Sequence, residues 1–299
     1  MDRRRGTRYN VNALILCGLV FFVIVATIFC MVANGREAAR EERRIAAEQQ
    51  AAAEQEAAEK KAQEEAEAAA EARKKSDSLQ PGVPVGTTEA SDDEKVVYLT
   101  FDDGPSKNTQ KVLDILEEYD AKATFFITGQ QPEYFPMIKT VYDAGHTIGL
   151  HSYVHDYNKV YASVDAYFED LEKIGNLAKE YIGFVPCYIR FPGGASNTVS
   201  KKYTPGIMSE LTEKVVEKGY QYYDWNVSSG DGEDATKDEI IKQSETDAYN
   251  HIMILFHDAA TKDTTVEALP DILKYYQDKG YEFRGIDRNS LIFHHQTNN

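Results

Sequence analysis

From Val96 to Ile286, short apolar segments alternate with amphipathic helical segments, and this alternation limits the fold more than any other feature. The apolar segments read as seven strands, VVYLTF, ATFFITG, HTIGLHS, YIRFPGG, YQYYDWNV, HIMILFHD and YEFRGI, and six helical segments separate them. Such alternation predicts an α/β fold with a parallel sheet covered by helices. Because no Gly-rich dinucleotide turn follows the first strand, a closed or nearly closed, distorted β/α barrel is favoured over a doubly wound sheet.

The N-terminal segment joins a basic stretch to an apolar run. Residues 13–33 carry no charge and are long enough to cross a bilayer as one helix. Residues 1–12 contain four arginines, so the positive-inside rule predicts a cytoplasmic N-terminus and an extracellular remainder. The alternative is a cleaved signal peptide. The length of the apolar run and the poor cleavage site MVANG favour an uncleaved, single-pass anchor in the cell membrane.

Residues 34–95 differ in composition from the rest of the chain. Ala, Glu, Gln, Lys and Arg dominate as far as Lys75 and favour a helix. A coiled coil would need larger apolar side chains than Ala in its seam, so a solvated stalk is favoured over a dimer, and the oligomeric state stays open. The segment SDSLQPGVPVGTTEASDDEK predicts a flexible linker. The catalytic domain is therefore expected at residues 96–288, followed by a disordered tail at 289–299 that holds His294 and His295.

Net charge and cysteine content exclude some partners and constraints. The formal net charge is -16, and an acidic domain repels phosphate backbones, so nucleic acid is not expected as a partner. Cys17 and Cys30 lie in the apolar run and Cys187 is alone in the main domain, so no disulfide is expected there. A domain of this size has enough core to fold without one.

Polar side chains follow the predicted strands where each strand ends. They are Asp102, Asp103, His151, Arg190, Asp224, His257 and Asp258. In a β/α barrel these strand ends share the face that carries the active site. His151 and His155 form an H-x3-H pair, which together with one carboxylate would suit a divalent metal with open positions. Spacing leaves open which aspartate ligates, and two surface histidines are the alternative interpretation.

The motifs TFDDGP, H-S-x-x-H, R-x-P-G, DWN and ILFHD, in this order, resemble those of the polysaccharide deacetylases of carbohydrate esterase family four. The resemblance covers the chain from about Val96 to Arg288. It implies a distorted β/α barrel that removes N-acetyl groups from sugars, usually with Zn²⁺, and Co²⁺ is the alternative metal.

The resemblance also implies a role for each matching residue. Asp103, His151 and His155 would hold the metal. Asp102 would be the general base that takes a proton from the attacking water, and His257 the general acid that protonates the departing amine. Arg190 would orient Asp102, and Asp224 would support Arg190 or His257.

Four further residues would form the substrate side of the site: Pro192, Gly193, Trp225 and Leu255. The backbone N–H of Gly193 would help to stabilise the oxyanion, and Trp225 and Leu255 would line the acetyl pocket. The more usual motif R-P-P-Y is Arg190-Phe191-Pro192-Gly193 here, so the missing tyrosine is expected to open one wall of the groove.

Together these features predict a membrane-anchored, metal-dependent deacetylase of cell-wall glycan, with a GlcNAc or MurNAc residue of peptidoglycan as substrate. An O-acetyl esterase or a chitin- or xylan-type deacetylase is the alternative within the enzymes. A non-catalytic wall-binding domain is the alternative from another class, and it is disfavoured because all the chemical residues are present.

Overall fold

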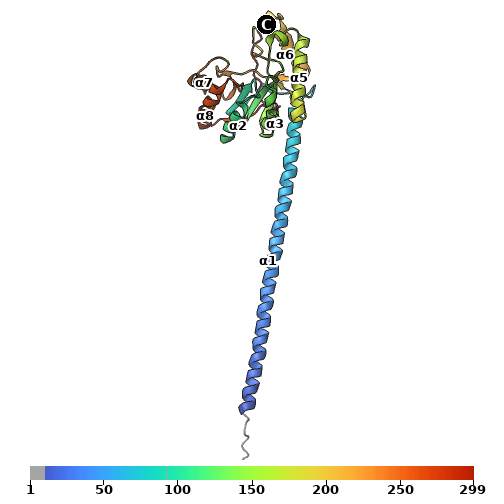
Figure 1. Cartoon of the computed structure of the whole chain (residues 1–299), viewed down its shortest axis with the longest axis vertical. Coiled ribbons are helices and arrows are strands. Elements are labelled where there is room, and N and C mark those ends of the chain that lie inside the picture. Colours follow the sequence, from blue (N-terminus) through green and yellow to red (C-terminus); the bar gives the residue numbers. More distant parts are fainter. Residues whose placement is uncertain (1–10, 92) are drawn as a thin grey trace, which may run out of the picture. The chain divides into compact units, whose positions relative to one another are not determined.

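The computed structural model describes residues 11–91 and 93–299, so most of the predicted basic tail at residues 1–12 lies outside the described residues. The chain divides into two compact units, residues 1–70 and 71–299. The first unit consists of helix α1 (Val11–Asp77), whose last turns belong to the second unit (Figure 1). By length and composition, the N-terminal part of α1 could cross a membrane.

Within the first unit, every described side chain from Ile15 to Ala70 is exposed. Beyond the apolar run, ion pairs one turn apart on the helix surface support the polar part, for example between Lys60 and Glu64 at 3.8 Å. Such exposed pairs stabilise a helix only slightly. The high helix propensity of Ala, Glu, Lys and Arg is therefore the main local reason for this long helix.

The second unit is built on a parallel sheet. Its strands are β1 (Val96–Asp102), β2 (Ala123–Thr128), β3 (Thr147–Ser152), β4 (Tyr188–Ile189), β5 (Gln221–Tyr222), β6 (Val227–Ser228), β7 (His251–His257) and β8 (Glu282–Phe283). The order is β5-β4-β3-β2-β1-β7-β6, and β8 pairs with β1. The predicted distorted β/α barrel of parallel strands is confirmed as a strongly curled sheet.

Helices separate the strands as expected. They are α2 (Thr109–Glu118), α3 (Met137–Asp143), α4 (Tyr157–Val160), α5 (Val164–Ile182), α6 (Ile207–Glu217), α7 (Lys237–Ser244) and α8 (Asp263–Asp278), with short 3₁₀ turns at Pro132–Tyr134 and Ser200–Lys202. Local sequence fixes the ends of α5: the Ser163 hydroxyl caps its first turn, and Gly183, with φ of 82°, ends it in the left-handed conformation.

One predicted strand is wrong in an informative way. The segment YQYYDWNV forms two short strands, β5 and β6, which are the two ends of the sheet and are joined by residues 223–226. The Tyr223 N–H donates to Ile189 O at 2.9 Å, and the Asn226 N–H donates to Met253 O at 3.2 Å. This short crossover therefore spans the gap between β4 and β7, and it nearly closes the barrel.

Strand alternation explains which side chains face the interior of the barrel. Along β1, Val97, Leu99 and Phe101 belong to the core shared with the helices, whereas Val96 and Tyr98 belong to a separate interior cluster. Successive side chains point to opposite faces, so Asp102 shares the interior face with Val96 and Tyr98. The same alternation places His257 with Met253 on β7. The packing of the apolar strand residues thus brings Asp102 and His257 to the same interior face of the barrel.

Residues 76–95 are predicted to be a flexible linker, but their described part makes specific contacts with distant residues. Val85 is buried, and residues 78 and 186 form a β-bridge. Arg288 donates to the carbonyls of Ser76 at 2.8 Å and Ser78 at 2.9 Å. Distant hydrogen-bond partners thus hold a segment rich in Gly, Pro and Ser in a fixed path. The predicted domain start at Val96 lies inside the compact unit, which begins at Glu71.

The C-terminal tail is also ordered, so the expected disorder of His294 and His295 is wrong. The His294 ring stacks on Tyr222 with centroids 3.6 Å apart. The His295 N–H donates to Asp224 Oδ2 at 2.8 Å. The tail therefore covers the β5–β6 crossover, whose aromatic and carboxylate groups give it partners that its own composition does not reveal.

Candidate active site

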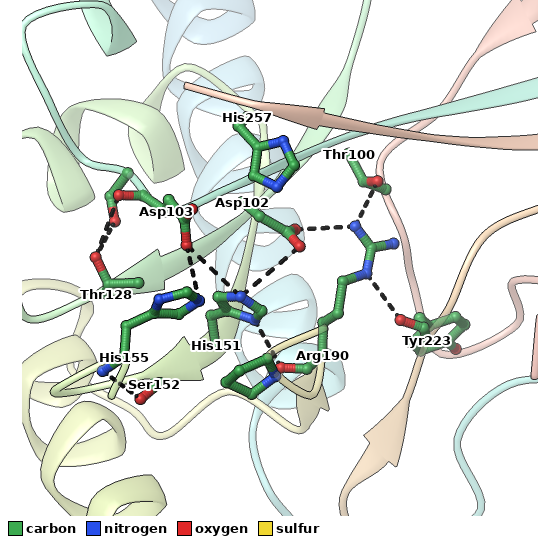
Figure 2. Close-up of polar contacts among 12 residues, drawn as sticks. Thr100, Asp102, Asp103, Thr128, His151, Ser152, His155, Arg190, Tyr223 and His257 are labelled. Carbon is green, nitrogen blue, oxygen red and sulfur yellow. Dashed lines mark hydrogen bonds and ion pairs between the residues drawn. The ribbon is translucent and has the colours of Figure 1, made fainter. Parts of the chain in front are cut away.

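Two adjacent carboxylates mark the end of β1. Asp102 ends the strand in register with His257 on β7, and Asp103 follows with φ of 72°, in the left-handed region that non-glycine residues rarely adopt. At Gly104, a Cβ would overlap the buried carboxylate of Asp258. This turn breaks strand alternation, so both aspartates contact the same histidine, His151 (Figure 2).

Asp103, His151 and His155 form a candidate metal-binding set. Asp103 Oδ1 lies 3.3 Å from His155 Nε2 and 3.6 Å from His151 Nε2. This oxygen is buried and has no hydrogen-bond partner among the described residues. A buried carboxylate oxygen that faces two imidazole nitrogens without a hydrogen bond is costly unless a cation joins them. The residues present therefore fit a divalent metal, and two histidines with one carboxylate leave positions open.

The surroundings of His151 keep its Nε2 available as a ligand. Its Nδ1 lies 2.8 Å from the Arg190 carbonyl oxygen, which can only accept, so Nδ1 carries the proton. Burial and the neighbouring His155 lower the pKa of His151 to about 3, so the ring is neutral at ordinary pH. A neutral imidazole with a fixed tautomer is what a metal ligand requires.

His155 is positioned by a residue that the sequence analysis missed. Asp170, buried on α5, accepts hydrogen bonds from Ser152 Oγ at 2.7 Å, Tyr153 N at 2.8 Å and Val154 N at 3.0 Å. Ser152 Oγ in turn accepts from the His155 N–H at 2.8 Å. These bonds fix the loop in which His155 adopts φ of 46°. A buried acid in the otherwise apolar stripe of α5 was the available signal.

Arg190 holds Asp102 on the side away from Asp103 and His155, as Figure 2 shows. Arg190 Nη1 donates to Asp102 Oδ1 at 2.9 Å and to Thr100 Oγ1 at 2.7 Å. The same guanidinium donates from Nε to Tyr223 O at 2.8 Å and from Nη2 to Asp224 O at 3.1 Å. Burial raises the pKa of Asp102, although the charge of Arg190 opposes that shift. The carboxylate is thus fixed in orientation and made more basic than an exposed aspartate.

His257 pairs with Asp231, an acid to which the sequence analysis gave no role. His257 Nδ1 lies 2.8 Å from Asp231 Oδ1, and the His257 N–H donates to Asp231 Oδ2 at 2.7 Å. Burial alone would lower the pKa of His257, but the hydrogen bond and charge of Asp231 outweigh it and raise the pKa to about 9. His257 is therefore a protonated imidazolium at neutral pH, with Nε2 free to donate.

Asp224 does not contact His257, and only its carbonyl contacts Arg190. Its buried carboxylate accepts from the Ala195 N–H and the His295 N–H, both at 2.8 Å. Of the two roles expected for Asp224, only a contact with Arg190 is present, through the Asp224 carbonyl, because Asp231 lies beside His257 instead. Asp224 organises the loop after β4 and the C-terminal tail.

The predicted substrate residues divide between two places. Leu255 and His257 line one hollow of about 490 Å³, together with Gly232, whereas Trp225 is not among its lining residues. The guanidinium carbon of Arg190 lies over the Trp225 ring, 5.5 Å from the ring centroid. The Trp225 ring also stands edge-on to His295. Leu255 thus shares a hollow with His257, and Trp225 packs against the buried arginine.

Pro192 and Gly193 form the centre of a tight turn. The Gly194 N–H donates to Phe191 O at 2.8 Å, and Gly193 has φ of 78°. Proline followed by a residue of positive φ is typical of a type II turn, and glycine meets that requirement without strain. In such a turn the N–H of Gly193 is left outside the turn's own hydrogen bond, so it is available to a ligand.

These groups place a buried carboxylate, a protonated imidazolium and a candidate metal-binding set at one end of a β/α barrel, and this arrangement is typical of a class of protein, the hydrolases. Residues 89–205 match the family model described as polysaccharide deacetylase. The chain belongs to the polysaccharide deacetylase family, whose members hydrolyse N-acetyl groups.

Named relatives and solved structures agree with this assignment. The chain is 36% identical over 225 residues to a peptidoglycan-N-acetylglucosamine deacetylase of Bacillus cereus, covering 71% of this chain and 78% of the relative. It is 31% identical to a peptidoglycan-N-acetylmuramic acid deacetylase of Bacillus subtilis, covering 65% and 71%. The crystal structure of the catalytic domain of a peptidoglycan N-acetylglucosamine deacetylase from Eubacterium rectale aligns with a TM-score of 0.68 and 41% identity, covering 71% of this chain and 98% of that one.

Proposed function

We propose that this protein is a metal-dependent N-deacetylase of cell-wall glycan, with peptidoglycan GlcNAc or MurNAc as its substrate. The observation that carries the proposal is the position of Asp102 and His257, opposite each other on adjoining strands and beside the Asp103–His151–His155 set. A carboxylate base and a histidine acid that flank a metal-ligating set are suited to hydrolysis of an amide.

The three ligands would hold Zn²⁺, with Co²⁺ as the alternative. Such a cation supplies a lower pKa for water and polarisation of the acetyl carbonyl. Asp102 is the base in this proposal. Arg190, which also donates to Thr100, fixes the orientation of the Asp102 carboxylate, and this carboxylate accepts a proton from the attacking water. The N–H of Gly193 donates to the oxyanion as the carbonyl becomes tetrahedral.

His257 is the acid. Its raised pKa keeps it protonated at neutral pH, and Asp231 holds its Nδ1 so that Nε2 faces the site. Breakdown of the tetrahedral intermediate requires a proton on the departing amine, because an amide anion is a poor leaving group. Nε2 supplies that proton, and Leu255 contacts the acetyl methyl group in the hollow beside it.

The N-terminal helix supports a proposal for the location of the protein. Residues 13–33 would anchor the protein in the cell membrane with its N-terminus in the cytoplasm, and residues 34–70 would extend outward as a stalk. The catalytic unit would then meet wall glycan outside the membrane. The named relatives act on peptidoglycan, which supports this substrate over chitin or xylan.

Acetate release from defined GlcNAc, MurNAc and O-acetylated oligosaccharides tests the proposal. Activity on an N-acetylated substrate should disappear with a chelator and return with zinc or cobalt. Full activity after metal analysis shows an empty protein would contradict the metal-dependent mechanism. Activity confined to the O-acetylated substrate would identify an esterase instead.

A further inference from the structure

Tyr157 occupies a place next to the site that the mechanism above does not use. It is the first residue of α4, directly after the loop that carries His155, and Asp156 caps this short helix by accepting from the Asn158 N–H. The Tyr157 ring stands edge-on to His155, with centroids 6.1 Å apart. It stands edge-on to Tyr161 as well, at 5.5 Å. Tyr157 therefore borders the candidate metal set on the side of α4.

The Tyr157 hydroxyl lies against the turn that holds the oxyanion donor. A Cβ built on Gly193 would overlap this hydroxyl, and the next nearest atom, Asn197 Cβ, would lie 3.2 Å away. The phenol thus fills the position where a side chain of residue 193 would begin. The groove wall that the missing tyrosine was expected to leave open is occupied from another element of the fold.

The neighbouring tyrosine shows that this hydroxyl is different. Tyr161 is fully buried, and its hydroxyl donates to Pro192 O at 2.8 Å. Tyr157 is only partly buried, and none of the hydrogen bonds found among the described residues involves its hydroxyl. Both tyrosines thus contact the same turn. The Tyr161 hydroxyl donates its hydrogen to the turn, whereas the Tyr157 hydroxyl keeps its donor available at the edge of the site.

We propose that Tyr157 is a substrate-binding residue, whose ring forms the groove wall beside Gly193 and whose hydroxyl donates a hydrogen bond to the sugar that carries the acetyl group. The inference rests on the proposed function, because it needs a glycan in the groove. A tyrosine suits this role, since its ring offers an apolar face and its hydroxyl a polar tip. The ligand class is an N-acetylated hexosamine within an oligosaccharide.

The test compares two substrates on the full-length protein in detergent. One is an N-acetylglucosamine oligosaccharide, and the other is 4-nitrophenyl acetate, which carries an acetyl group but no sugar. Tyr157→Phe should lower kcat/KM on the oligosaccharide about 3- to 10-fold, the usual effect of one lost hydrogen bond. It should leave kcat/KM on the aryl acetate and the affinity for zinc unchanged. Tyr249→Phe, an exposed tyrosine before β7 and away from the site, is the matched control.

The other outcomes contradict the assignment in distinct ways. An equal loss on both substrates with zinc affinity unchanged would place the hydroxyl at the acetyl carbonyl and not on the sugar. A loss of zinc affinity would show that Tyr157 positions His155 and does not act by binding the sugar. No loss on either substrate would remove it from the site. A wild-type protein that releases no acetate from any N-acetylated glycan would instead overturn the proposed function itself.

A double-mutant cycle tests the contact between the two residues independently of folding defects. Gly193→Ala places a methyl group where the hydroxyl lies, so it should damage the wild type more than it damages the Tyr157→Phe variant. The strain of alanine at positive φ is common to both backgrounds and cancels in the comparison. Equal damage in the two backgrounds would show that the hydroxyl does not occupy the space beside Gly193.

Discussion

The stalk and the catalytic unit use the same charged residue types in opposite ways. In the stalk, Lys60 and Glu64 form an ion pair in which both side chains are largely exposed. In the catalytic unit, Arg190 and Asp102 form a pair that is almost completely buried. Exposed pairs contribute little individually, whereas a buried charge that loses its partner is strongly destabilising. The contrast teaches that charge matters here by location: it keeps one region soluble and extended, and it fixes the geometry of the other.

The largest effect is expected where two adjacent carboxylates differ in role. Asp102→Asn should retain metal but lose about 10²- to 10⁴-fold in kcat, because an amide cannot accept the proton from water. Asp103→Asn should lose metal, because a neutral amide is a poorer ligand for a hard cation. Metal content and acetate release measured on both variants decide the assignment. If Asp102→Asn emptied the site and Asp103→Asn did not, the two roles would be exchanged.

Truncation tests where the stalk ends. A protein that begins at Glu71 should fold and hydrolyse soluble oligosaccharides normally, because residues 34–70 are exposed. A protein that begins at Ser91 should lose about 3 kcal/mol or more, since it lacks buried Val85 and the carbonyls that bind Arg288. Thermal unfolding of both proteins provides the measurement. Equal stability would mean that residues 71–90 are a linker after all.

Asp170 should matter through metal affinity. Asp170→Asn replaces one of the two carboxylate oxygens by an NH2 group, so at least one of the three hydrogen bonds that shape the His155 loop loses its acceptor. A loss of about 10- to 100-fold in zinc affinity is expected, as for other residues that orient metal ligands. Competition with a chelating dye measures it. Glu169→Gln, one position earlier on α5, is the control and should bind zinc as the wild type does.

Asp231 should set the alkaline limit of activity. The pKa of His257 is raised to about 9, so the acid is protonated below that pH and activity falls as pH rises through it. Asp231→Asn removes the charge responsible for the raised pKa. The alkaline limb of the kcat/KM profile should then move to lower pH, toward the ordinary histidine value of about 6.5. An unmoved limb would assign that ionisation to another group.

The smallest effect belongs to the stalk. Glu64→Gln removes one exposed ion pair, and surface changes of this kind usually alter stability by less than about 0.5 kcal/mol. Helix content by circular dichroism and the rate of acetate release should both match the wild type. A clear loss of either would show that the stalk charges act collectively, and it would weaken the contrast between the two regions.

Much of the barrel could be predicted because its strands and helices have strong local patterns. Along the apolar strands β1, β2, β3 and β7, alternating side-chain direction fixes which residues face inward, and the polar residues that end these strands therefore meet. The H-x3-H pair and a carboxylate beside it could be predicted on the same grounds, whereas the choice of Asp103 over Asp102 rested on the family resemblance.

Other features depend on partners far away in the sequence. Asp231 finds His257 across 26 residues, and Asp224, which seemed equally suitable, binds Ala195 and His295 instead. The packing of residues 76–86 depends on Arg288, and no property of the segment itself reveals that contact. Composition predicts flexibility only when tertiary hydrogen bonds do not override it.

The crossover from β5 to β6 links the closure of the barrel to the orientation of Asp102. Residues 223–226 complete the barrel, and the carbonyls of Tyr223 and Asp224 hold the guanidinium that orients Asp102. Without this crossover, Arg190 lacks the two carbonyl acceptors that hold it in the orientation in which it binds Asp102. In the mechanism proposed above, hydrolysis therefore requires the closed crossover, whereas none of the three candidate metal ligands comes from it.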